Sequence, residues 1–131
     1  MYSHITLGVN DIQKSINFYD GLMSILGYQR QHSSDDFAGY GDLKDAKIGN
    51  NFLWLLRPIN GEPASAGNGT NIAFDASSRS IVDEFYKKAM ELGGSDEGQP
   101  GIRPGAHENF YVAYVRDPDG NKLVCVCHAA E

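Results

Sequence analysis

The sequence predicts an α+β fold in which one domain, residues 1–131, is built from two βαβββ modules. The first observation is an internal repeat, because residues 67 positions apart are identical at five places, without a gap, between His4 and Gly27. The second observation is that each copy opens with a strand pattern followed by a helix pattern. Duplication places module one at about residues 1–60 and module two at about residues 69–131. The identical pairs are Ile5 with Ile72, Phe18 with Phe85, Tyr19 with Tyr86, Met23 with Met90 and Gly27 with Gly94.

Module one begins with a short strand from about Ser3 to Val9, followed by a helix. Asn10 is the candidate N-cap, because Gln13 three positions later gives an approximate capping box. Apolar residues then recur at helical spacing, and Gly27 ends the helix. The predicted buried face consists of Ile12, Ile16, Tyr19, Met23 and Leu26.

The rest of module one is predicted to form strands. Gly, Ser and Asp clusters interrupt the segment from Tyr28 to Ile48, so we expect two short strands with a loose connection. Phe52–Leu56 is a continuous apolar run of strand length, which Pro58 stops. The stretch from about Asn60 to Asn68 is rich in Gly, Ala and Pro, and we expect it to connect the modules.

Module two starts with a predicted strand at Asn71–Phe74. Ser77 to Ser80 supply residues typical of a helix start, and Gly93-Gly94 ends the helix. The predicted buried face of this second helix consists of Ile81, Phe85, Ala89 and Leu92.

The end of module two is predicted to be a loop followed by a hairpin. The loop, rich in Gly and Pro, runs from Ser95 to Gly105. The hairpin strands are Phe110–Arg116 and Lys122–Cys127, and their turn is Asp117-Pro118-Asp119-Gly120. Pro presets the first corner of such a turn, and Gly accepts the left-handed residue that follows.

The composition excludes several classes of function. Seventeen acidic against eleven basic residues give a formal charge of −6, so we expect no nucleic-acid partner. No apolar run has the length of a membrane span, and no export signal opens the chain, so we expect no membrane partner. Cys125 and Cys127 have no further cysteine to pair with, and free thiols favour a cytoplasmic location. His128 points away from both on a strand, so a joint metal site is not expected.

Four segments carry a family resemblance. They are Ser3-His4-Ile5, Ser15-Ile16-Asn17-Phe18-Tyr19, Asn71-Ile72-Ala73-Phe74 and, most specific, Val115-Arg116-Asp117-Pro118-Asp119-Gly120-Asn121-Lys122. With these segments, nearly the whole chain resembles the vicinal oxygen chelate superfamily of glyoxalase I, extradiol dioxygenases, fosfomycin-resistance enzymes and bleomycin-binding proteins. The resemblance implies that the two βαβββ modules form an open half-barrel cleft, the glyoxalase/bleomycin resistance-like fold.

The resemblance also implies where a metal would bind. In metal-dependent members, side chains from the first and last strand of each module hold it. His4 matches the first position, Asn71 stands where His is usual, and Trp54 and Val124 stand where carboxylates are expected. Transition metals need three or four His, Cys or carboxylate ligands, and only His4 is of that type. We therefore expect no metal and no cofactor; a divalent metal with an altered ligand set is the less favoured alternative.

The favoured function is binding of a small organic molecule in a largely apolar cleft lined by His4, Trp54, Asn71 and Val124. His4 has three open roles: a remnant metal ligand, a hydrogen-bonding cleft residue or a satisfied strand histidine. Trp54 either stacks on a ligand or fills the core. Asn71 either hydrogen-bonds His4 or contacts a ligand.

Arg103 and His107, on the loop before the last hairpin, are further candidate ligand contacts. The alternative function is a glyoxalase- or dioxygenase-like enzyme, with an altered metal set or with a metal-free mechanism that uses His4 or His107 as the catalytic residue. A third alternative is a structural or regulatory dimer without a ligand. We expect a homodimer in any case, because family members of this size usually pair and the strand edges are apolar.

Overall fold

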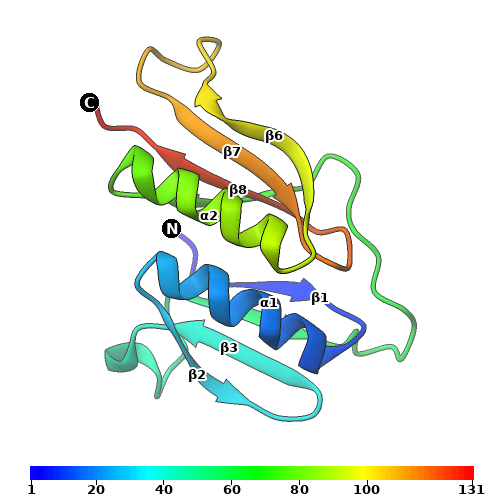
Figure 1. The fold of residues 1–131 in the computed structure, drawn as a ribbon. Coiled ribbons are helices and arrows are strands. Elements are labelled where there is room, and N and C mark those ends of the chain that lie inside the picture. Colours follow the sequence, from blue (N-terminus) through cyan, green and yellow to red (C-terminus); the bar gives the residue numbers. More distant parts are fainter.

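A computed structural model describes all residues 1–131, and two βαβββ modules are confirmed (Figure 1). The elements of module one are β1 (His4–Gly8), α1 (Ile12–Ile25), β2 (Gln29–Ser33), β3 (Phe37–Gly41), the 3-10 helix η1 (Leu43–Asp45) and β4 (Phe52–Leu56). The elements of module two are β5 (Ile72–Asp75), α2 (Arg79–Glu91), β6 (Ser95–Ile102), β7 (Tyr111–Arg116) and β8 (Lys122–Cys127). Neither helix has the length and apolar character needed to span a membrane.

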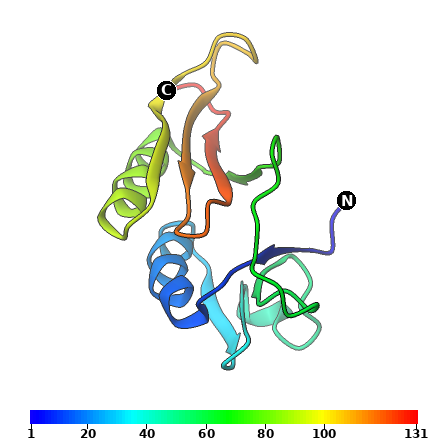
Figure 2. The same cartoon turned by 90° about the vertical axis from the view of Figure 1, so that its right-hand side faces the viewer.

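Each module forms its own four-stranded sheet, ordered β1-β4-β3-β2 in module one and β5-β8-β7-β6 in module two. In both sheets the first and last strands pair in parallel, and the other pairs are antiparallel. Both helices cover the same side of the two sheets, which leaves an opposite face that we call the open face of each sheet (Figure 2). We call the boundary between the modules the seam; the edge strands β1 and β5 border it.

The segment Ser95–Ile102 is strand β6, so the loop predicted there is wrong over these residues. Its pairing with β7 shifts register between Asp96 and Gly98 and again between Gly98 and Gly101. β6 is an exposed edge strand with no apolar alternation, and its pairing comes from the backbone ladder to β7 rather than from a local pattern.

The N-cap of α1 is Asp11, not the predicted Asn10. Asp11 Oδ1 accepts a hydrogen bond from Lys14 N at 3.1 Å. Asn10 bonds to distant segments instead: its Oδ1 accepts from Ala64 N at 2.7 Å, and its N donates to Asp119 Oδ1 at 3.0 Å. The Ser77–Ser80 prediction is confirmed, because Ser78 caps α2.

The two helices pack closely across the seam. A Cβ atom on Gly21 of α1 would lie 2.5 Å from Leu92 Cδ1, so this approach depends on the glycine. Leu92 follows the end of α2 and stays 36% exposed, less buried than predicted. Phe18 of α1 is buried beside Gly94 of module two, outside the predicted face. One hydrophobic core therefore includes residues of both modules.

A polar network around the β7–β8 turn closes one end of the seam. Asp117 is only 3% exposed and accepts a hydrogen bond from the Tyr19 hydroxyl of α1 at 2.6 Å. The backbone N of Asn121 donates to Asp117 Oδ1 at 2.8 Å, and Asn121 Nδ2 donates to Gly8 O at 2.9 Å. The turn of module two is thus bonded directly to β1 and α1 of module one.

Burial governs the ionisation of this network. Burial raises the pKa of Tyr19, and the charge of Asp117 raises it further. Burial also raises the pKa of Asp117 above its usual value, although hydrogen bonds from Tyr19 and Asn121 partly offset this. The network holds the modules together and leaves none of its groups free for a ligand.

Candidate functional site

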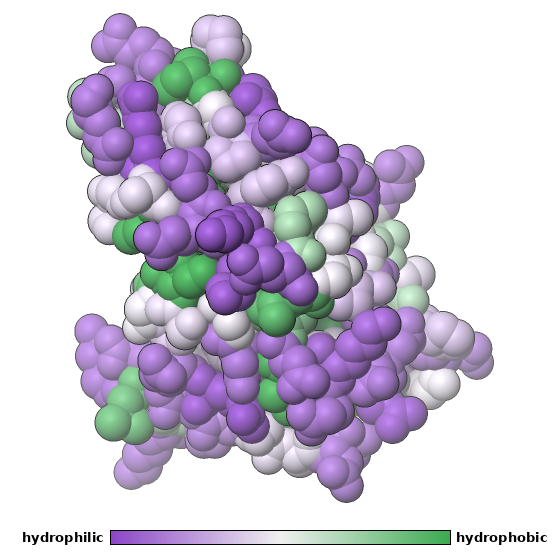
Figure 3. Space-filling model, in the orientation of Figure 1, coloured by the Kyte–Doolittle hydropathy of each residue, from purple (hydrophilic) through white to green (hydrophobic).

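The opposite end of the seam contains a cavity of about 390 Å³. The N-terminal residues with β1, the end of α1 with the turn after it, β4 and β5 form its walls. Figure 3 shows hydrophobic surface where the two halves of the molecule meet. Cavities of this volume with mostly apolar walls are typical of small-molecule sites. The hydrophobic lining residues include Ile5, Met23, Leu26, Phe52, Ile72 and Phe74.

Four polar side chains also line the cavity, those of Ser3, His4, Asn51 and Asp75. His4 is exposed, and its Nδ1 lies 3.0 Å from Ser3 Oγ, which leaves Nε2 free. The carboxylate of Asp75 takes part in none of the ion pairs of the chain. Apolar walls with a few free polar groups suit an amphipathic molecule.

Trp54 lies outside this cavity, on the open face of the module one sheet. Leu53 and Leu55 of β4 enter the core, so Trp54 faces the other way. A Cβ on Gly39 would lie 2.4 Å from the Trp54 ring, so the indole rests directly on β3. His32 stacks on Trp54 with ring centroids 5.8 Å apart. The indole is thus half-buried among aromatic rings on the open face, and it belongs to neither hydrophobic core cluster.

His32 and two phenylalanines complete this aromatic cluster. The ring centroids of Phe52 and Phe37 lie 5.4 and 6.1 Å from that of Trp54. His32 Nε2 lies 2.7 Å from Ala46 O, which attaches the segment after η1 to the cluster. His32 is not recognisable from the sequence as a member of this cluster, because it falls in the segment where no regular pattern is visible.

Val124 faces the open face of the module two sheet. Leu123 and Cys125 of β8 enter the main core, whereas Val124 joins a separate cluster with Val112 and Val126. Val124 is 3% exposed and does not line the cavity. The equivalent positions of the two modules therefore hold an indole in one and an aliphatic cluster in the other.

Asn71 is exposed and precedes β5, and its side chain forms no hydrogen bond within the chain. The hydrogen bond of His4 goes to Ser3 instead. Of the four predicted cleft residues, only His4 lines the cavity.

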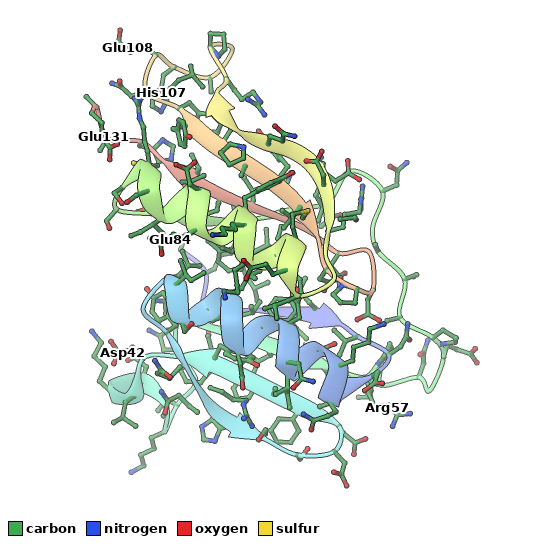
Figure 4. The ribbon with its side chains drawn as sticks, in the orientation of Figure 1. Asp42, Arg57, Glu84, His107, Glu108 and Glu131 are labelled. Carbon is green, nitrogen blue, oxygen red and sulfur yellow. The ribbon has the colours of Figure 1, made fainter.

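Arg103 and His107 lie in module two, away from the cavity. The Arg103 guanidinium donates to Gln99 O at 2.9 Å and lies 5.9 Å from the Tyr114 ring centroid. His107 Nε2 lies 2.8 Å from His128 Nδ1, and the two rings stack. Figure 4 shows His107 at the far end of module two.

The side chains present do not fit the metal that the resemblance implies. No group of three or more His, Cys, Asp or Glu side chains converges in the chain. Trp54 and Val124 offer no donor atom, and the Asn71 amide is a poor ligand for transition metals. Burial raises the pKa of Cys125 to about 12, which keeps this thiol protonated and unsuited to metal binding.

Comparison with known proteins gives consistent relatives. A model of the Glyoxalase/Bleomycin resistance protein/Dioxygenase superfamily matches residues 2–124. The chain is similar to a glyoxalase/bleomycin resistance protein from Albidiferax ferrireducens T118, with 35% identity and a TM-score of 0.85 over 98% of this chain and 99% of that chain. A glyoxalase-related enzyme from Fulvimarina pelagi shares the fold at 19% identity and a TM-score of 0.73, over 97% and 87% of the two chains.

A lactoylglutathione lyase of Neisseria meningitidis serogroup A is 28% identical over 129 residues, which cover 92% of this chain and 85% of that relative.

Proposed function

The chain belongs to the Glyoxalase/Bleomycin resistance protein/Dioxygenase superfamily, and from this we propose that it binds a small amphipathic molecule in the seam cavity without the usual metal. The observation that supports this most directly is the cavity itself, about 390 Å³ with mostly hydrophobic walls and His4 at its border. Burial of apolar ligand surface supplies the affinity, and the free polar groups orient the ligand.

The chemistry of the donor set supports binding without a metal. His4 is the one ligand-type side chain at the four positions that the family uses, and no cluster of such side chains replaces the others. A single imidazole does not hold a transition metal against a weak chelator. We expect well under one equivalent of zinc, nickel, iron or manganese in the dialysed protein by elemental analysis, and stoichiometric metal would contradict the proposal.

Two leucines give a matched test of the cavity. Leu26 and Leu92 each follow the last residue of a helix, but only Leu26 lines the cavity. A metabolite library is first screened against the wild type by thermal shift. Leu26→Trp should fill the cavity and weaken binding of a hit at least tenfold, whereas Leu92→Trp should leave the affinity unchanged. Equal affinities of the two variants would place the ligand elsewhere.

A second candidate, metal-free catalysis by His4, is favoured by the free Nε2 of this residue at the cavity border. A histidine with a free ring nitrogen can accept or donate a proton at neutral pH. If a hit is also turned over, His4→Gln should abolish turnover while the dissociation constant changes less than tenfold. Unchanged turnover would remove His4 from the reaction.

We also propose a homodimer. Six large hydrophobic side chains of module one and its connector are exposed, and pairing of two chains would remove side chains of this kind from water. Light scattering at micromolar concentration should give twice the mass of the 14.3 kDa chain, and the monomer mass would contradict the proposal. The exposed residues are Met1, Tyr2, Leu43, Ile48, Leu56 and Ile59.

A further inference from the structure

The edge of β1 that borders the seam carries backbone groups without partners. In a strand, the N–H and C=O of one residue point to one side, and those of the next residue point to the other. Val9 N donates to Leu56 O, so the odd-numbered residues of β1 face β4. The N–H and C=O groups of His4 and Thr6 therefore point into the seam. Gly8 has the same direction, since its carbonyl accepts from Asn121 across the seam.

The edge of β5 mirrors this arrangement. Ala76 N donates to Val126 O, so the even-numbered residues of β5 face β8. The backbone groups of Ala73 and Asp75 therefore point away from β8, toward the seam. No backbone hydrogen bond joins β1 to β5, because the two strands belong to separate sheets. Each edge thus offers two residues with free donors and acceptors.

Both edges border the same volume. Ser3–Ile5 and Ile72–Asp75 line the seam cavity from opposite sides, and the apolar side chains at its walls include Leu26 and Met23. A peptide that adds to a sheet edge gains main-chain hydrogen bonds, and pockets for its side chains give specificity. The end of the seam that contains the cavity combines both features, free strand edges and an apolar pocket.

We propose that the seam cavity takes a short, extended, peptide-like molecule whose amide groups pair with β1 on one side and with β5 on the other. An apolar side chain of this ligand occupies the hydrophobic part of the cavity. The proposal rests on the small-molecule site proposed above and names its ligand class. Successive residues of an extended chain present their amides to opposite sides, so two residues are enough to reach both edges.

Amide hydrogen exchange of the full chain tests the pairing residue by residue. The probe is N-acetyl-Leu-Ala-amide, titrated into the ¹⁵N-labelled protein. The amides of His4, Ala73 and Asp75 should exchange fast without peptide and become protected with it. The amides of Leu7 and Phe74, which face the ladders inside the sheets, should be slow throughout. Protection that does not alternate along the strands would overturn the proposal.

An ester analogue supplies the matched ligand. It replaces the central amide of the probe by an ester, which keeps the shape and removes one N–H. The amide should bind about fivefold more tightly, the ratio that corresponds to about 1 kcal/mol for one net hydrogen bond. Equal binding of amide and ester in the cavity would overturn the strand pairing while the small-molecule site stands. Absence of binding by both would also overturn it, and the library screen then decides the site alone.

A pair of protein variants gives a second readout. Ala73→Pro removes one seam-facing N–H and leaves the bonds to β8, because proline is tolerated on a strand edge. Ala73→Val keeps that N–H. The proline variant should bind the amide about fivefold more weakly than the valine variant, and equal affinities would count against the proposal. Protection of His4 and Ala73 that grows with protein concentration, without peptide, would assign the edges to a second copy of the chain and overturn the proposal.

Discussion

The two ends of the seam differ in how the modules contact each other. At one end, Asp117 and Asn121 of the β7–β8 turn are bonded to Tyr19 and Gly8 of module one, and the network is largely buried. At the other end, His4 and Asp75 border a cavity with apolar walls, and the strand edges are unpaired. The segment from Val115 to Lys122, which resembles the family most specifically, thus joins the modules at one end, which we call the closed end. The other end, which we call the open end, has room for a ligand.

This difference separates stability from binding along one boundary. A buried polar network is costly to break, because each buried donor left without a partner has lost its hydrogen bonds to water and gains none in the protein. An unfilled cavity contributes little to the free energy of unfolding, so substitution of the residues that line it changes chiefly which ligand fits. Substitutions at the closed end should therefore change the free energy of unfolding, and substitutions at the open end should change affinity.

The largest expected effect is that of Asp117→Ala. The substitution leaves the Tyr19 hydroxyl and the Asn121 amides without their acceptor in a buried place. We expect a loss of about 4 kcal/mol in the free energy of unfolding, from two or more unsatisfied donors. Denaturant unfolding measures it. A loss below about 1 kcal/mol, the range of a single exposed hydrogen bond, would contradict the claim that the buried network around Asp117 stabilises the contact between the modules.

The next effect is that of Trp54→Ala on the open face of module one. Trp54 is half-buried against Gly39 and stacked by His32, so its removal leaves a gap in the aromatic cluster. We expect a loss of about 3 kcal/mol, at the lower limit for a fully buried tryptophan. The affinity for a cavity ligand should change less than threefold. A small stability loss with a large affinity loss would restore Trp54 as a ligand contact.

Tyr19→Phe should cost about 2 kcal/mol, the range for a buried hydrogen bond to a charged acceptor. Tyr40→Phe is the matched control, since Tyr40 donates to Asp20 at 2.7 Å on the partly exposed side of module one. The control should cost about 1 kcal/mol, because water can replace Tyr40 at Asp20. Equal losses in the free energy of unfolding would mean that the buried hydrogen bond of Tyr19 stabilises the protein no more than the partly exposed one of Tyr40.

The smallest effect concerns pH. Burial raises the pKa of Asp117 in the folded protein above its ordinary value of 3.8, so the folded state binds a proton more tightly than the unfolded state. The stability that this proton contributes is present at low pH and is lost as the pH rises through the raised pKa. The wild type should therefore lose stability relative to Asp117→Asn, which cannot titrate, as the pH rises from the ordinary value of 3.8 through the raised pKa. A constant difference between the two unfolding curves would contradict the raised pKa.

The sequence is sufficient to predict the topology but not the seam. The repeat from Ile5 to Gly94 determines two equal modules, and helical spacing identifies α1 and α2. β6 has no apolar alternation, so its pairing is set by β7 alone. Asp117 is recognisable as a turn residue, but its bond to Tyr19, 98 positions away, depends on how the modules pack.

The cavity cannot be predicted from the sequence for a related reason. Leu26 and Ile72 belong to a helix end and a strand that each look like ordinary core. They face a common space only because the modules meet at the other end of the seam. His4 is recognisable from the sequence because it begins the first strand, where metal-dependent family members carry a metal ligand.

The most direct test of the cavity as the ligand site is methyl NMR of the full chain with a hit from the library. The methyl groups of Leu26 and Ile72 report on the cavity, those of Val124 and Val126 report on the open face of module two, and the Trp54 indole N–H reports on module one. We expect ligand-induced shifts and intermolecular contacts at Leu26 and Ile72, and none at the valines or the indole. Contacts at Val124 or Trp54, with Leu26 and Ile72 unaffected, would contradict the account.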